Sequence, residues 1–298
     1  MIKRRDFIKN SAKIIGASLM FGNFSLMAKT NKGVKMEYVT LHNQVKMPIL
    51  GYGTYAIRDS KTILNAINLG YRLIDTAQMY GNEKEVGEAV RLSGVKREEF
   101  FIETKLSSSM SYEGAKKGIE RSLKDLNLDY IDLLLIHEPY NSSKEMYKAM
   151  EEFYERGILK SIGISNFTSS AYKEFIKTCN VIPMVNQCET HPFYQQSSLI
   201  ETMKPYKTVL QSYSPFVSGR DGIFNNQVLQ EIAKKHNKSV AQVTLRFLIQ
   251  QNIIAIPKSS KAEHMKQNID IFSFELDNND MSKIAKLDRN KSSFSWGY

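Results

Sequence analysis

Four side chains that could act together on one substrate lie in the first half of the sequence. They stand at, or just after, the ends of three apolar runs and are Asp75, Tyr80, Lys105 and His137. A tyrosine hydroxyl, whose ordinary pKa is near ~10, is a poor acid until a neighbouring cation makes its anion easier to form. Lys105 could supply that cation, and Asp75 could keep Lys105 protonated and oriented. With His137 hydrogen-bonded to the same oxygen, the set could protonate a carbonyl oxygen while its carbon accepts hydride.

Each of these residues also has a purely structural interpretation. Asp75 and Lys105 could form an ion pair that only stabilises the fold, and His137 could be a hydrogen-bonded histidine of the core. Such explanations suffice for one residue at a time, whereas four such residues at strand ends that converge by chance are much less expected. The catalytic interpretation therefore depends on elements that bring the four side chains to one place.

Short β-rich runs alternate with helical patterns from residue 37 onward. Residues 37–41 and 44–49 predict an opening hairpin around His42-Asn43. Eight strand-like runs follow, at residues 50–55, 71–76, 100–106, 130–137, 159–165, 183–189, 208–214 and 253–257. Apolar residues at three- and four-residue spacing predict helices at 61–69, 83–92, 112–126, 144–155, 171–178, 197–204, 226–235, 239–251 and 262–269.

This strict alternation predicts an α/β fold, a (β/α)8 TIM barrel with an N-terminal β-hairpin. An open, doubly wound sheet would predict a Gly-x-Gly-x-x-Gly turn after the first strand, and Gly51-Tyr52-Gly53-Thr54 is not one. No linker interrupts the pattern, so we predict one barrel domain over residues 37–290 and a C-terminal tail at 291–298. Active sites of such barrels lie at the carboxyl ends of the strands, where the four residues fall.

The first 28 residues differ from the rest of the chain. Residues 3–13 hold five basic residues against one acidic residue, and include the pair Arg4-Arg5. A mildly apolar stretch, residues 12–28, follows and ends in a small residue. This order is typical of an export signal, and the arginine pair favours the twin-arginine route. We expect export to the periplasm, or a cytoplasmic protein if the signal does not function; the alternative is an amphipathic helix packed on the barrel.

Composition argues against several other classes of protein. The chain has 298 residues, is 42% apolar and has a net charge of +10, part of which lies in the N-terminal stretch. No later segment gathers Lys and Arg among aromatics, so we predict no nucleic-acid surface. Polar residues interrupt the apolar stretch at 12–28, so we predict no stable membrane span. Without close Cys/His spacing we predict no metal site, and Cys179 and Cys188 should stay unpaired.

Four segments resemble the signatures of one enzyme family. Residues 70–83 (GYRLIDTAQMYGNE), 135–139 (LIHEP), 163–167 (GISNF) and 256–260 (IPKSS) are similar to motifs of the aldo-keto reductase family, in the family's order and spacing. The resemblance covers about residues 39–287. It implies an NAD(P)H-dependent oxidoreductase that reduces small aldehydes or ketones to alcohols.

The resemblance also implies a role for each of the four residues. Tyr80 would be the proton donor, tuned by Lys105 and Asp75, and His137 would orient the substrate. Residues that we assign to the substrate pocket are Tyr55, Glu138 and Tyr140.

Most of the remaining motif residues would hold the cofactor. Ser165, Asn166 and Gln187 would hydrogen-bond the nicotinamide carboxamide and so fix which face of the ring is presented. The other residues that we assign to the cofactor site are Gly53 and Thr54 after the first strand, Tyr213 stacked on the ring, Lys258 and Ser259 at the adenosine phosphates, His264 nearby, and Gln267 and Asn268 near the adenine.

Two positions depart from the family's pattern. Glu138 stands where the family often has Trp, and a carboxylate there would disfavour anionic substrates and leave space that Trp would fill. His264, six residues after Lys258, stands where Arg commonly binds the 2′-phosphate of NADPH. A histidine side chain is mostly neutral at pH 7 and cannot grip phosphate through a bidentate fork. Lys258 still favours NADPH, with NADH as the alternative.

Two other functions fit the same barrel. One is a non-catalytic, NAD(P)H-binding, redox-responsive regulatory protein, against which the intact set of four residues argues. The other is a lyase or isomerase without nicotinamide, against which Gln187 and Lys258-Ser259 argue. The fold alone does not separate these functions. For partners, we expect a small-molecule carbonyl substrate and a monomeric protein.

Overall fold

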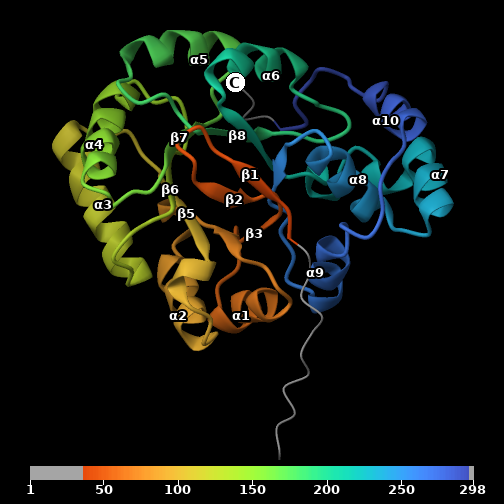
Figure 1. Cartoon of the computed structure of the whole chain (residues 1–298), viewed down its shortest axis with the longest axis horizontal. Helices are drawn as coiled ribbons and strands as arrows, with labels where there is room; N and C mark the ends of the chain where they lie inside the picture. The colour runs from red at the N-terminus through yellow and green to blue at the C-terminus, as the bar shows by residue number, and fades with distance from the viewer. Residues whose placement is uncertain (1–35, 295–298) are drawn as a thin grey trace, which may run out of the picture. The chain divides into compact units, whose positions relative to one another are not determined.

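Parallel strands ringed by helices make up the described part of the chain (Figure 1). The computed structural model describes residues 36–294. The predicted export signal, residues 1–28, lies outside the described residues, and the predicted tail is described only from 291 to 294.

The strands of the barrel follow one another around the sheet in sequence order. After the antiparallel hairpin strands β1 (Tyr38–Thr40) and β2 (Lys46–Pro48), they are β3 (Gly51–Gly53), β4 (Leu73–Asp75), β5 (Phe101–Leu106), β6 (Leu133–Ile136), β7 (Ile162–Ser165), β8 (Val185–Glu189), β9 (Val209–Tyr213) and β10 (Ile254–Ala255). Each barrel strand lies inside a run that the sequence predicts as a strand. The predicted (β/α)8 barrel with an N-terminal hairpin is confirmed.

The barrel closes between its first and last strands. β10 pairs in parallel with β9, and a further parallel bridge joins Ala255 to Leu50, the residue before β3. The Ala255 N–H donates to the Ile49 oxygen (3.0 Å), and the Gly53 N–H donates to the Pro257 oxygen (3.1 Å). Because β10 has only two residues, few hydrogen bonds complete the ring.

Helices connect the strands on the outside of the barrel (Figure 1). They are α1 (Ser60–Asn68), α2 (Glu83–Leu92), α3 (Tyr112–Leu126), α4 (Ser143–Glu155), α5 (Ser169–Phe175), α6 (Ser197–Met203), α7 (Gln227–His236), α8 (Val240–Ile249), α9 (Ala262–Ile269) and α10 (Asn278–Ala285). Short 3₁₀ helices are η1 (Gln78–Tyr80), η2 (Arg97–Glu99), η3 (Ile176–Thr178), η4 (Lys204–Tyr206), η5 (Val217–Gly219) and η6 (Ile223–Asn225). Across residues 36–294, no helix has the length and apolar character needed to cross a membrane.

The helix α10 is not among the predicted helices. It begins after Asp277 with Asn278 and Asn279, residue types that are common in turns. In the structure Asp277 caps the helix by accepting the Asp280 N–H (2.9 Å), and Asp280 reaches back to the Asp277 N–H (3.3 Å). Lys235 of α7 donates to the Asp280 carboxylate (2.8 Å). Tertiary contact and a capping box thus stabilise a helix too short to show a clear apolar period.

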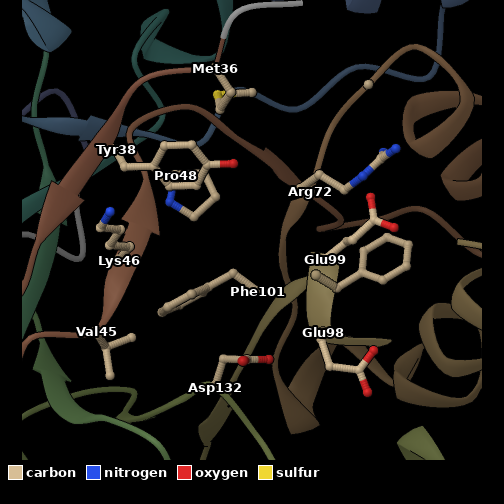
Figure 2. A pocket seen from close by; sticks show the side chains of 12 residues that line it. Met36, Tyr38, Val45, Lys46, Pro48, Arg72, Glu98, Glu99, Phe101 and Asp132 are labelled. Atoms are coloured by element: carbon tan, nitrogen blue, oxygen red, sulfur yellow. The ribbon is translucent and has the colours of Figure 1, made fainter. Parts of the chain in front are cut away.

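The hairpin β1–β2 lies across the amino-terminal end of the barrel. Its turn contacts the starts of later strands, because His42 Nε2 is 3.0 Å from the Ile182 oxygen and Asn43 donates to the Lys160 oxygen (2.9 Å). A cavity of about 570 Å³ lies between the hairpin and the starts of β4, β5 and β6 (Figure 2). The opposite end of the barrel, where the strands finish, is left open by the hairpin.

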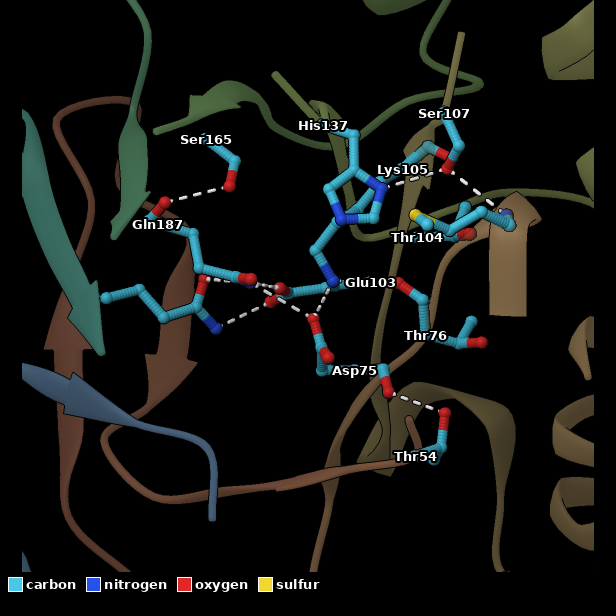
Figure 3. Close-up of polar contacts among 12 residues, drawn as sticks. Thr54, Asp75, Thr76, Glu103, Thr104, Lys105, Ser107, His137, Ser165 and Gln187 are labelled. Atoms are coloured by element: carbon cyan, nitrogen blue, oxygen red, sulfur yellow. Dashed lines mark hydrogen bonds and ion pairs between the residues drawn. The ribbon is translucent and has the colours of Figure 1, made fainter. Parts of the chain in front are cut away.

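Alternate side chains of each strand face the inside of the barrel. In β5 the hydroxyl of Thr104 donates to Glu83 of α2 (2.7 Å), on the outside. Glu103 and Lys105, one position to either side, lie inside the barrel (Figure 3). All residues of β5 are buried, so the inward polar groups must find partners among themselves.

Candidate active site

Charged and amide side chains form a buried layer at the carboxyl-terminal end of the barrel (Figure 3). The layer consists of Asp75 of β4, Glu103 and Lys105 of β5, Gln187 of β8 and Gln211 of β9. None of these residues is more than 3% exposed. Hydrogen bonds inside the layer therefore replace those that water would make.

Lys105 is fully buried and paired with Asp75. Its ammonium group donates to Asp75 Oδ1 and to the backbone oxygen of Thr76 (2.9 Å). Burial alone would lower the pKa of Lys105, but the negative groups around it, above all Asp75, raise that pKa above its ordinary value. Lys105 therefore stays charged at neutral pH, next to Asp75, which the sequence analysis predicts as its partner.

Tyr80 is the last residue of η1, the turn that follows β4. Lys105 Nζ is 5.2 Å from the ring centre, and the ring of Tyr55 meets that of Tyr80 edge-on at 5.2 Å. Burial raises the pKa of Tyr80 to about 12, although the charge of Lys105 lowers it. The expected influence of Lys105 thus has the right sign but is outweighed by burial. Tyr80 keeps its proton at neutral pH until a stronger base is in place.

His137 follows β6 and faces the same phenol. The ring centres of His137 and Tyr80 are 5.8 Å apart, and the rings are nearly perpendicular at 78°. Burial lowers the pKa of His137 to about 3, and the charge of Lys105 adds to this effect. The imidazole is therefore neutral at physiological pH and can act through a hydrogen bond rather than through a positive charge.

Glu103 is a second buried carboxyl group beside Asp75. Gln187 Nε2 donates to Glu103 Oε1 (2.6 Å) and to Asp75 Oδ1 (3.0 Å), and Gln211 Nε2 donates to Glu103 Oε2 (2.8 Å). Burial, and next the charge of Asp75, raise the pKa of Glu103 well above its ordinary value. The two amide side chains therefore hold both carboxyl groups in place.

The sequence assigns no role to Glu103 or Ser107, although the structure places both against predicted site residues. Ser107 Oγ is 2.9 Å from His137 Nδ1. The alternation of strand side chains could have found both, because they stand two positions before and after Lys105. A lysine that faces the inside of the barrel predicts that these neighbours face the same way.

Residues predicted to bind the nicotinamide group end the neighbouring strands. Ser165 Oγ donates to the Gln187 backbone oxygen (2.8 Å), and Asn166 Nδ2 donates to the His137 backbone oxygen (3.3 Å). Asn166 has a φ of 65°, a left-handed conformation that Asn tolerates better than most residues. Tyr213 is half-buried at the end of β9. These residues and the four predicted catalytic residues thus share one end of the barrel.

Residues predicted to hold the adenosine end follow β10 and run along α9. Exposed among them are Lys258, His264 and Gln267, whereas Ser259 is half-buried and Asn268 is buried. Gly53 lies close to this loop, because a Cβ added there would be 3.0 Å from the Ile256 oxygen. Thr54 is fully buried, and its hydroxyl donates to the Asp75 backbone oxygen (2.8 Å). Thr54 therefore supports the strand that ends in Asp75.

Aromatic side chains mark the outer part of the site. Tyr55 and Met79, which flank Tyr80, are 62% and 61% exposed. Glu138 and Tyr140, predicted for the substrate pocket, are half-buried after His137. Burial raises the pKa of Glu138, and it raises the pKa of Tyr140 to about 12. The exposed Met79, which the sequence does not single out, adds apolar surface next to the proposed donor.

The described end of the chain is fastened at this same end of the barrel. Glu189, the last residue of β8, accepts the Ser293 N–H (2.8 Å) and the hydroxyl of Ser292. A cavity of about 410 Å³ lies beside this contact and is lined in part by Asn166 and Tyr213. The sequence analysis predicts residues 291–298 only as a tail, because no local pattern indicates a contact with a residue about a hundred positions earlier.

Comparison with known proteins covers the whole barrel. The model of the Aldo/keto reductase family matches residues 50–289. The chain is 44% identical over 260 residues to a 9,11-endoperoxide prostaglandin H2 reductase of Trypanosoma cruzi, covering 85% of this chain and 92% of the relative. It is 42% identical over 259 residues to a glyoxal reductase of Bacillus subtilis, covering 85% and 93%. An aldo-keto reductase from a Medee basin deep-sea metagenome library has a TM-score of 0.84 at 40% identity, covering 86% of this chain and 97% of that one. This chain therefore belongs to the aldo/keto reductase family.

Proposed function

We propose that this protein reduces small aldehydes or ketones to alcohols with a nicotinamide cofactor, and that Tyr80 donates the proton. The observation that carries the proposal is the meeting of three groups at one end of the barrel. Lys105 Nζ is 5.2 Å and the His137 ring 5.8 Å from the centre of the Tyr80 ring. A related chain from Bacillus subtilis bears the name glyoxal reductase, which supports a small carbonyl compound as substrate.

The protonation states of these groups suit a reaction in which a carbonyl oxygen gains negative charge. A nicotinamide cofactor, when bound, would supply the hydride. Tyr80 holds a proton at its hydroxyl, since burial raises its pKa to about 12. The charge of Lys105 stabilises the phenolate that remains after proton transfer. His137, which is neutral, can hydrogen-bond the carbonyl oxygen without placing a second full charge in the site.

The residues present fit a nicotinamide dinucleotide. Gln187 donates from its side-chain nitrogen to Asp75 and Glu103 in the buried layer, and its side-chain oxygen is the atom of the amide that could accept from a carboxamide. Ser165 and Asn166 stand on the adjacent strand end. At the other end of the site, Lys258 is an exposed cation for phosphate. We propose NADPH as the preferred cofactor and NADH as a weaker one, because His264 lacks the fork of Arg.

The test uses the full chain with NADPH, NADH and a panel of small carbonyl compounds that includes glyoxal. We expect consumption of NADPH in step with formation of the alcohol. Binding of NADPH without turnover of any compound in the panel would favour the regulatory alternative. Failure to bind either cofactor would contradict the proposal and favour a lyase or isomerase.

We further propose that residues 1–28 direct export to the periplasm through the twin-arginine route. The support is the pair Arg4-Arg5 before a mildly apolar stretch, together with a family match that begins only at residue 50. Replacing both arginines by Lys should leave the full-length protein in the cytoplasm, which cell fractionation would show. Unchanged periplasmic accumulation would contradict this route.

A further inference from the structure

The hydroxyl of Ser107 lies between two side chains that the proposed reaction brings to one oxygen. Ser107 is the first residue after β5 and is half-buried. Its Oγ is 2.9 Å from His137 Nδ1 on one side. On the other side it accepts the backbone N–H of Met79 (3.2 Å), the residue before Tyr80 on η1. One small side chain therefore contacts the imidazole, as Figure 3 shows, and also the turn that carries the phenol.

The direction in which this hydroxyl points its hydrogen decides which tautomer the imidazole adopts. A serine hydroxyl has one hydrogen to donate and can accept through its lone pairs. One lone pair of Ser107 Oγ accepts the Met79 N–H. The single hydrogen of the hydroxyl can point either to His137 Nδ1 (2.9 Å) or to the Lys105 backbone oxygen (3.2 Å). The shorter contact is the one to Nδ1. A donated hydrogen there makes Nδ1 the acceptor, so the proton of the neutral ring must be on Nε2.

We propose that Ser107 is a positioning residue that keeps His137 in its Nε2–H form and holds the turn of Tyr80 in place beside it. The proposal rests on the proposed function, because the Nε2–H form matters only if a carbonyl oxygen binds between His137 and Tyr80. With hydrogen on Nε2, the ring donates to that oxygen. With hydrogen on Nδ1, it would present a lone pair and repel the oxygen.

The surroundings leave this choice of tautomer to Ser107. Burial lowers the pKa of His137 to about 3, so a second ring proton does not remove the choice at neutral pH. Nδ1 is the ring nitrogen that contacts Ser107, at 2.9 Å. Lys105 in β5 and Ser107 directly after β5 are two positions apart, and they contact Tyr80 and His137 respectively. A single strand end thus positions both groups.

The first experiment measures the tautomer directly and needs no turnover. The chain has five histidines, so the ring signals of 15N-histidine-labelled full-length protein can be assigned with a His137→Gln variant. Long-range 1H–15N spectra of the cofactor-free protein should show the Nε2–H form for His137. In Ser107→Ala this form should give way to a mixture, and in Ser107→Thr, which keeps the hydroxyl, it should persist.

The second experiment measures carbonyl reduction by the same variants. We expect kcat of Ser107→Ala to fall about fivefold to tenfold, as for the loss of one neutral hydrogen bond that acts on the transition state, with recovery in Ser107→Thr. The affinity for NADPH should stay unchanged. Ser109→Ala is the matched control, because Ser109 lies in the same loop and bonds Ser142 (2.7 Å) instead.

The outcomes separate this inference from the proposed function. An Nδ1–H ring in the unmodified protein, or the same tautomer in Ser107→Ala, would overturn the role of Ser107 even if the enzyme is active. A shift of tautomer with no change in kcat would overturn it as well. Absence of any carbonyl reduction by the unmodified protein would instead refute the proposed function, and with it the reason for the positioning.

Discussion

The two ends of the barrel both contain buried charge, but they arrange it differently. At the amino-terminal end, Arg97 Nη2 is 2.6 Å from Asp132 Oδ2, and the same carboxylate accepts the Ile102 N–H (2.8 Å). The guanidinium also lies 4.0 Å from the centre of the Tyr130 ring. One positive group thus meets one negative group, and Figure 2 shows Asp132 at the edge of the cavity that the hairpin covers.

At the carboxyl-terminal end, the charges are shared among more groups. Lys105 stands near two carboxyl groups, Asp75 and Glu103, and contacts the phenol of Tyr80. The pKa of Tyr80 is raised and that of His137 is lowered, so both are neutral beside a permanent cation. The larger cavity, about 570 Å³ against about 410 Å³, lies at the other end. Cavity size is therefore a poorer guide to chemistry here than adjacent groups whose pKa values move in opposite directions.

The largest expected effect concerns Tyr80. Tyr80→Phe removes the proposed donor at the carboxyl-terminal end and keeps the ring. We expect kcat to fall by at least ~100-fold, within the usual range for general acid catalysis. NADPH affinity, measured by fluorescence titration, should change little because the hydroxyl serves only the acceptor. Near-normal turnover would show that Tyr80 is not the proton donor, and that the carboxyl-terminal end does not differ from the other end in this way.

A change at the amino-terminal end should affect stability rather than rate. Asp132→Ala removes the acidic partner of Arg97 and the acceptor of the Ile102 N–H. We expect the free energy of unfolding to fall by roughly 2 kcal/mol, measured in urea, with kcat of the folded enzyme unchanged. Glu174→Ala is the control, because it breaks an ion pair with Lys177 whose side chains are exposed, and should cost less than about 1 kcal/mol. Lost kcat at full stability would show that both ends serve catalysis.

A smaller effect is expected at the proposed phosphate end of the site. His264→Arg places a fork of donors on α9, where the side chain is exposed. NADPH should bind about tenfold more tightly, because a charge-assisted bidentate contact forms with its 2′-phosphate. NADH, which lacks that phosphate, should bind as before. Equal changes for the two cofactors would mean that position 264 faces another part of the ligand.

The smallest effect is an expected absence of change with pH. The active form needs Tyr80 protonated, which holds below its pKa of about 12. It also needs His137 neutral, which holds above its pKa of about 3. Therefore kcat should be level between about pH 5 and pH 9, and fall only outside that window. A midpoint near the ordinary histidine pKa, at about 6.5, would show that His137 changes charge during turnover.

Much of the barrel could be predicted because local patterns determine its elements. The bounds of α2, α3 and α9 match the predicted helices residue for residue, since each has a clear apolar stripe. The site followed from one rule about barrels. The carboxyl ends of the strands lie on one face of the barrel, so Asp75, Lys105 and His137, which stand at such ends, are expected to lie close together.

What could not be predicted depends on distant parts of the chain. The pKa of Tyr80 reflects how deeply the whole fold buries it, whereas the sequence shows only that a lysine is available. The contact between Glu189 and Ser293 joins residues whose local sequence carries no sign of each other. The helix α10 needs Lys235 of another helix. In each case, contacts between residues far apart in the sequence determine the outcome, and local propensity does not.

The join between β3 and β10 has a consequence for how the protein would respond to its cofactor. Beyond β10, the chain continues directly into the loop with Lys258, and the hydroxyl of Tyr52 in β3 donates to the Ser259 backbone oxygen of that loop (2.6 Å). A ligand seated on this loop would hold the two edges of the barrel together, and would raise the free energy of local opening there. The backbone amides of Gly53 and Ala255 would then exchange with deuterium more slowly as cofactor is added. The exchange rates of these amides between β3 and β10 would therefore report how much of the cofactor site is occupied.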